Sequence, residues 1–73
     1  MNNIINSCWV IKVTYLKTKQ VNFNEAYRTL ERCKKEIDKK ITNDIDKQII
    51  DEYTIKDLEN DIIYEAKLVD IFE

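Results

Sequence analysis

The chain of 73 residues contains neither glycine nor proline, and this absence constrains its fold more than any other feature. Because those two residues supply most of the special backbone conformations of tight turns, the turns here must come from Asn, Asp, Lys and Thr. The lack of glycine excludes phosphate-binding loops, nucleophile elbows and dinucleotide-binding turns. Histidine, the commonest general base and metal ligand, is also absent. These absences predict a protein that works without catalysis and without a cofactor or metal.

Length and composition predict one small domain that spans residues 1–73. Charged residues make up 36% of the chain and hydrophobic residues 44%, a balance too apolar for a disordered protein. No apolar stretch approaches the roughly 20 residues that a membrane span needs, and residues 1–7 do not form a secretory leader. We therefore expect a soluble cytoplasmic protein that contacts no membrane, in which Cys8 and Cys33 are structural thiols.

Two segments are predicted to be strands because apolar and polar residues alternate along them. Residues 8–17 form the first strand, whose core face carries Trp9, Ile11, Val13 and Tyr15. Residues 62–72 form the second, with Tyr64, Ala66, Leu68 and Phe72 on one face. A helix over this last segment is the alternative.

A long amphipathic helix is predicted over residues 24–41, with Asn24 as its N-cap. Its apolar face is formed by Phe23, Tyr27, Leu30, Ile37 and Ile41. Residues 21–23 can add a brief extended piece before it. Residues 44–60 fit either a short helix or a strand, and Thr54 with Asp57 as a capping box favours the helix.

Together these elements predict an α+β fold in which the helix lies across a small antiparallel sheet. One helix covers one face of a sheet, so the second face needs another partner. That face is expected to carry Val10, Leu16, Ile63, Val69 and Ile71. A homodimer or a protein partner can cover it.

The charges divide unevenly along the chain, and this division suggests a surface for a partner. Residues 1–43 carry nine basic and four acidic residues, a net charge of +5, whereas residues 44–73 carry three basic and ten acidic residues, a net charge of −7. Acids spaced along a folded surface can imitate nucleic-acid phosphates and occupy a basic groove. The predicted protein-binding residues are Asp51, Glu52, Tyr53, Asp57, Glu59 and Asp61. A solubilising surface, or attraction between the two halves of the chain, is the alternative.

A basic stripe offers a different site. Arg28, Arg32, Lys35 and Lys39 recur at helical spacing, and a phosphate backbone could dock on them. The solvated face of an amphipathic helix is the structural alternative. The Glu65-Ala66-Lys67 segment also matches the Glu-x-Lys pattern of metal-dependent nucleases, but that pattern arises by chance in so charged a chain, and a solvated strand face is preferred.

The Trp-bearing first strand, the Phe-Asn-Glu-Ala helix entry and the final IYEAKLVDIFE strand resemble the tiny α+β proteins that phages and mobile elements encode. Several of those proteins are anti-CRISPR or other anti-defence inhibitors, and some act through acidic surfaces. The resemblance implies an inhibitor that blocks a basic, nucleic-acid-handling protein in the cytoplasm of a host cell. A small DNA- or RNA-binding regulator and a homo-oligomeric accessory protein are the alternatives.

Overall fold

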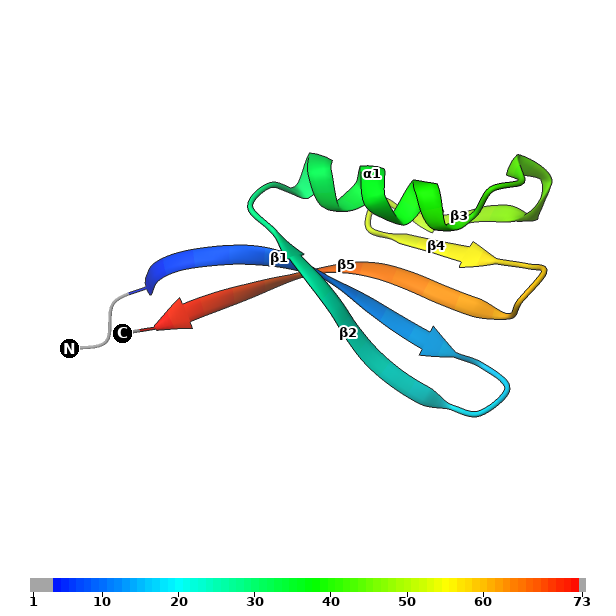
Figure 1. The fold of residues 1–73 in the computed structure, drawn as a ribbon, viewed down its shortest axis with the longest axis horizontal. Coiled ribbons are helices and arrows are strands. Elements are labelled where there is room, and N and C mark those ends of the chain that lie inside the picture. Colours follow the sequence, from blue (N-terminus) through cyan, green and yellow to red (C-terminus); the bar gives the residue numbers. More distant parts are fainter. Residues whose placement is uncertain (1–3, 73) are drawn as a thin grey trace.

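Two long strands, β1 (Ile4–Tyr15) and β5 (Ile62–Phe72), pair antiparallel along the centre of the molecule (Figure 1). The computed structural model describes the backbone of residues 4–72 and the side chains of residues 7–70. Within that range five strands form one open antiparallel sheet in the order β2-β1-β5-β4-β3. The remaining elements are β2 (Gln20–Tyr27), α1 (Leu30–Lys40), the 3₁₀ turn η1 (Asp44–Asp46), β3 (Lys47–Asp51) and β4 (Thr54–Asp57). The predicted α+β fold, with a small antiparallel sheet and one helix, is therefore confirmed.

The two strands predicted from alternation are both present, and their register puts the expected side chains on one face. Ile11 pairs with Ala66, and Val13 pairs with Tyr64. Because directly paired residues of neighbouring strands point to the same face, these four side chains share one side of the sheet. All four are buried.

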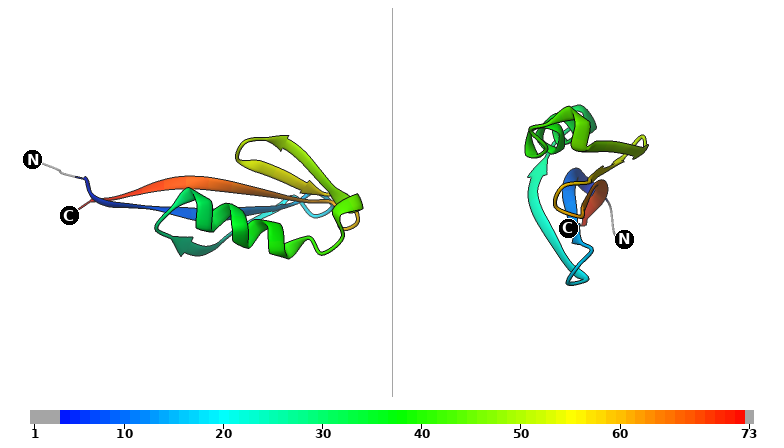
Figure 2. Two further views of the ribbon diagram at one scale, coloured as in Figure 1. Left: turned by 90° about the horizontal axis from the view of Figure 1, so that it is seen from above. Right: turned by 90° about the vertical axis from the view of Figure 1, so that its right-hand side faces the viewer.

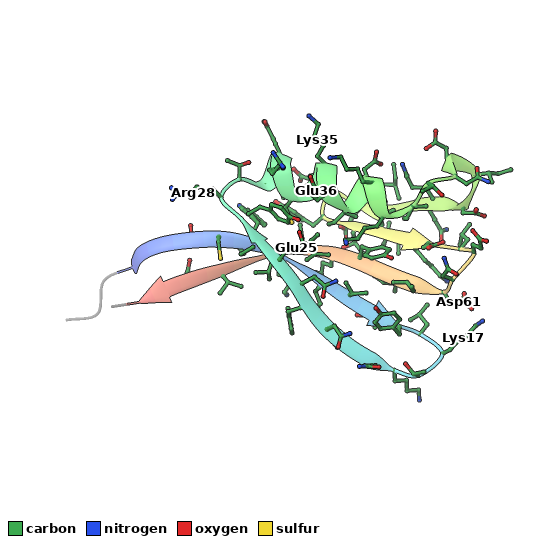
Figure 3. All side chains as sticks on the ribbon, in the orientation of Figure 1. Lys17, Glu25, Arg28, Lys35, Glu36 and Asp61 are labelled. Carbon is green, nitrogen blue, oxygen red and sulfur yellow. The ribbon has the colours of Figure 1, made fainter. Side chains whose placement is uncertain are left out.

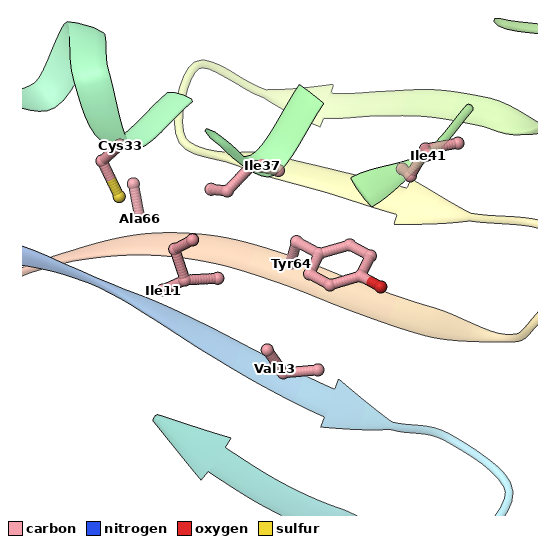
Figure 4. Close-up of a cluster of buried hydrophobic side chains, with 7 residues drawn as sticks. All are labelled: Ile11, Val13, Cys33, Ile37, Ile41, Tyr64 and Ala66. Carbon is pink, nitrogen blue, oxygen red and sulfur yellow. The ribbon is translucent and has the colours of Figure 1, made fainter. Parts of the chain in front are cut away.

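The helix covers that face and completes the core. Its buried residues, Cys33 and Ile37, lie one turn apart and point at β1 and β5 (Figure 4). The buried cluster consists of Ile11, Val13, Cys33, Ile37, Ile41, Tyr64 and Ala66. Cys33 is 0% exposed, as expected of a structural cysteine, and burial raises the pKa of its thiol.

The helix is shorter than the predicted span of 24–41, because its first residues belong to a strand. Residues 20–27 pair with β1 as β2, and Asn24 lies opposite Ile11 in that ladder. The N-cap is instead Thr29, whose hydroxyl accepts a hydrogen bond from the backbone N–H of Arg32 at 3.2 Å. Asn24 has the right chemistry for a cap, but pairing with β1 satisfies the backbone of the whole segment, so tertiary structure overrides the local signal.

Replacing Thr29 by alanine is expected to lower the free energy of unfolding by about 1 kcal/mol, because the cap hydrogen bond is lost. Hydrogen exchange of the first-turn amides, including that of Arg32, should speed up in this variant. Asn24→Ala is the matched control and should leave those amides unchanged. Fraying of the helix in Asn24→Ala would contradict the assigned start of α1.

Residues 44–60, left open between helix and strand, form a 3₁₀ turn followed by a β-hairpin. The favoured short helix over 55–59 is wrong, because Ile55 lies in β4 and pairs with Ile49 of β3 on one side and Tyr64 of β5 on the other. The periodicity of this segment fits both structures, and only pairing with β5 selects the strand.

The turns use the residue types that the lack of glycine and proline requires. Two non-glycine residues adopt a left-handed backbone, Lys19 with φ of 61° and Asp61 with φ of 52°. Lys19 closes the β1–β2 turn, and Asp61 closes the β4–β5 turn. A left-handed residue with a side chain costs roughly 1–2 kcal/mol, so these turns store strain that the paired strands must offset.

Candidate functional site

Within residues 4–72, one face of the sheet has no helix over it. Figure 2 shows α1 along one side of the sheet, with no helix on the opposite side. The register identifies the side chains on that opposite side: Val10 pairs with Lys67, Thr14 pairs with Ile63, and Cys8 pairs with Val69. On β2, Val21 lies opposite Thr14 and Phe23 lies opposite Lys12. We call this surface the open face, with apolar members Val10, Val21, Phe23, Ile63 and Val69.

The open face carries large apolar side chains that are exposed. Phe23 is 63% exposed and Val21 is 44% exposed, while Val10 and Ile63 are half-buried between their neighbours. Large apolar side chains that gather on one exposed surface mark a contact site more often than scattered ones do. Leu16, expected on this face, follows β1 in the turn and is also exposed. Ile71, also expected here, and Phe72, assigned to the core face, lie outside the described side chains.

Phe23 was assigned to the apolar face of the predicted helix, and that assignment is wrong. In β2 it lies opposite Lys12 on the open face, away from α1. Sequence reasoning therefore missed Val21 and Phe23 as surface residues of the site. The signal that could have found them is the short apolar alternation of residues 21–23.

A charged pair lies within the open face. Lys12 and Glu65 are directly paired across β1 and β5, and both are half-buried. Among the residues described, neither takes part in an ion pair. Lys67 on β5 and Lys56 on β4 are further cations on this face. Lys12 and Glu65 therefore lie side by side, and each can still form an ion pair with a charged group of a partner.

The predicted acidic surface does not form as a single patch. Asp57 is only 3% exposed, so its prediction as a contact residue is wrong. One carboxylate oxygen accepts the backbone N–H of Glu59 at 3.0 Å and that of Asn60 at 3.4 Å, and the other accepts the Asn60 side chain at 2.9 Å. Asp57 therefore holds the β4–β5 turn together from inside.

The remaining acids divide between two turns at opposite ends of β4. Asp51 ends β3 and Glu52 follows it in the β3–β4 turn, and Asp51 accepts the backbone N–H of Tyr53 at 2.8 Å. Glu59 and Asp61 lie in the β4–β5 turn. A strand separates the two pairs, so no continuous row of carboxylates faces a partner.

Tyr53 is held against the sheet instead of projecting freely. Its ring stacks on Trp9 with centroids 5.9 Å apart and planes 10° apart, and its backbone oxygen accepts the N–H of Ala66 at 2.9 Å. Stacking of this kind is worth about 0.5–1.5 kcal/mol beyond the buried area. Part of the ring stays exposed, but its main contact is internal.

The basic stripe on the helix is partly neutralised by its own neighbour Glu36. That carboxylate lies 3.3 Å from Arg32 and 3.2 Å from Lys39. The hydrogen bond from Lys39 is the largest cause that lowers the pKa of Glu36, and the positive charges of Lys39 and Arg32 lower it further. Lys35 remains exposed, and Arg28 precedes the helix. Figure 3 shows Arg28 and Asp61 toward opposite ends of the molecule. The stripe is therefore a weaker anion site than its spacing suggested.

An open groove of about 580 Å³ runs between α1 and β4, with Ile55 of β4 on its wall. Its helix side mixes both signs of charge, since Arg32, Lys35 and Asp38 all line it. At the end of the helix Lys47, whose side chain is 13% exposed, pairs with Asp38 and, at 3.2 Å, with Asp44. These hydrogen bonds raise the pKa of Lys47 and tie β3 to α1. In the described range, no ion pair joins a basic residue of segment 1–43 to an acidic residue of segment 44–73.

The described side chains include no group of three or more acids and thiols arranged to hold a metal. No helix in the described residues has the length and apolarity to cross a bilayer. Tyr27, beside the core, donates its hydroxyl to Glu25, and this hydrogen bond together with burial raises its pKa to about 12. Its proton therefore stays on the phenol at neutral pH, and it serves packing.

The resemblance to phage-encoded proteins stays an expectation from the sequence. Comparison of the chain with protein-family models, with curated proteins and with solved structures found no match.

Proposed function

We propose that this domain acts by binding a protein, without catalysis, and that the open face is its contact surface. The observation that carries the proposal is the exposure of Val21, Phe23 and Val69 on a sheet face that no helix covers. Burying apolar surface of this kind contributes roughly 25 cal/mol per Å², which is the main driving term of protein association.

An inhibitor of a nucleic-acid-handling protein belongs to this class of binding proteins. The open face supports such a role better than the acids do, because the exposed acids lie in two separate turns and Asp57 is buried. Direct nucleic-acid binding by the helix has less support, since Glu36 pairs with two of the four stripe residues.

A comparison of baits tests the proposal. Wild type, Val21→Ser/Phe23→Ser, Asp51→Lys/Glu52→Lys/Glu59→Lys and Arg28→Glu/Lys35→Glu would each be immobilised and exposed to the same cell lysate, prepared from cells that also express the free wild-type chain. We expect the open-face variant, Val21→Ser/Phe23→Ser, to capture at least about tenfold less protein than wild type, because exposed aromatic anchors contribute most of the binding energy of protein contacts. Ile45→Ser is the matched control, as Ile45 is exposed in η1, away from this face.

The other variants decide between the rival surfaces. Unchanged capture by Val21→Ser/Phe23→Ser would overturn the proposal. Loss of capture in the acid-reversal variant alone would assign the contact to the acidic turns, and loss of bound DNA or RNA in Arg28→Glu/Lys35→Glu would assign it to the helix. Circular dichroism of each bait would confirm that the fold is intact.

A further inference from the structure

Resting on the proposed function, we infer that the partner of the open face is a second copy of this chain. The two copies dock face to face about a two-fold axis that runs along the seam between β1 and β5. In such an isologous contact, residue i of one copy meets residue j of the other, and residue j meets residue i.

The charged pair supports this arrangement. Lys12 and Glu65 lie side by side across the seam. A two-fold axis along the seam places each β1 side chain opposite the β5 residue to which it is paired in its own chain. Lys12 of each copy then faces Glu65 of the other, so one adjacent pair supplies two ion pairs across the interface. An adjacent pair of opposite charges is self-complementary about such an axis.

The other cross-strand pairs of β1 and β5 on this face meet in the same way. Thr14 meets Ile63 of the other copy, Val10 meets Lys67, and Cys8 meets Val69, since each is a cross-strand pair within one chain. Two sheets that pack with nearly aligned strands cross at about 30° and interdigitate their facing side chains. Lys67 lies beside the seam, where its long apolar stem can pack on Val10 of the other copy while its ammonium group extends toward water, and Lys56 on β4 lies farther from the seam.

The size of the face fits a weak dimer. Three strands with about seven residues each and β4 with four residues, about 4.8 Å apart and at about 3.3 Å per residue, give a footprint of roughly 400 Å². Standard interfaces bury about 800 Å² of accessible surface per partner, and side-chain relief makes the accessible surface larger than the footprint. The contact is therefore smaller than a standard interface, and we expect it to form only at high protein concentration. Chains of this length also gain stability from association, because a single small hydrophobic core supplies little stabilising free energy.

Sedimentation equilibrium of the whole chain tests the inference, at concentrations from about 1 μM to about 1 mM, the range in which weak interfaces form. Wild type is expected to approach a dimer at the upper end. Lys12→Glu and Glu65→Lys should each weaken the dimer at least about tenfold, because every copy then presents like charges to its partner. Lys35→Glu, an exposed change on the helix, is the matched control and should behave as wild type.

The mixture of the two variants gives the decisive result. Equimolar Lys12→Glu and Glu65→Lys should form a heterodimer, since two acids on one face then meet two lysines on the other. The double variant Lys12→Glu/Glu65→Lys should recover self-association. Phe23→Ser, which removes an exposed ring without touching these charges, should also weaken the wild-type dimer at least about tenfold.

A wild type that stays monomeric at the highest concentration would overturn the inference, as would a mixture that fails to associate. A dimer that persists in both single variants and in Phe23→Ser would place the contact on another surface and overturn it as well. A monomeric wild type whose open-face variant still loses a captured protein would leave the proposed function standing, with three open-face lysines pointing to an acidic partner.

Discussion

Replacing Ile37 by alanine is expected to lower the free energy of unfolding by about 3–4 kcal/mol. Ile37 is 1% exposed in the middle of α1 and points at the buried face of the sheet (Figure 4). The change removes its transfer free energy and leaves a cavity that a small, close-packed core fills only in part. Domains have total stabilities of about 5–15 kcal/mol, and a short chain lies at the low end, so the variant should approach unfolding.

Urea denaturation followed by circular dichroism measures this loss. Ile45→Ala is the matched control, because the same residue type is 80% exposed in η1 and its truncation should change stability by about 0.5 kcal/mol or less. Both variants should be compared at one protein concentration, since self-association would add to apparent stability. Equal losses in the two variants would contradict the assigned core.

Replacing Asp57 by alanine is expected to cost about 2–4 kcal/mol, although the residue is charged and lies in a turn-forming segment. Its carboxylate accepts three hydrogen bonds, from the backbone N–H groups of Glu59 and Asn60 and from the Asn60 side chain. Truncation leaves these donors without their acceptor at a partly buried turn, and an unsatisfied buried donor costs more than the lost bond itself contributed.

The same denaturation experiment checks this prediction, with Asp51→Ala as the matched control. Asp51 is exposed and accepts one backbone N–H, from Tyr53, so its loss should cost about 1 kcal/mol or less. Asp57→Asn keeps an oxygen acceptor for the backbone and should lie between the two. A cost for Asp57→Ala no larger than that of Asp51→Ala would show that Asp57 does not hold the turn.

The strands were predictable because their signal is local and repeated. Alternation along residues 8–17 and 62–72 located β1 and β5 and assigned Ile11, Val13, Tyr64 and Ala66 to the buried face. The same rule placed Leu68 on that face, yet Leu68 is 53% exposed. Alternation assigns a side of the sheet, whereas burial also depends on which part of that side the helix covers.

The start of the helix and the residues of the site were harder to predict. Asn24 and Thr29 are both sound N-cap residues, and the choice between them depends on whether residues 20–27 find a strand to pair with. Asp57 is indistinguishable from its acidic neighbours in sequence, and only the path of the β4–β5 turn brings three donors to its carboxylate.

Local patterns in the sequence were enough to predict two alternating strands and an amphipathic helix that can cover only one face of a sheet. Tertiary structure decided the rest. It placed Phe23 on the open face, divided the acids between two turns and brought Lys12 beside Glu65. The physical reason is the distance along the chain over which each effect acts. Periodicity and turn chemistry act within a few residues, whereas the surface depends on pairings between segments more than fifty residues apart, such as Lys12 with Glu65.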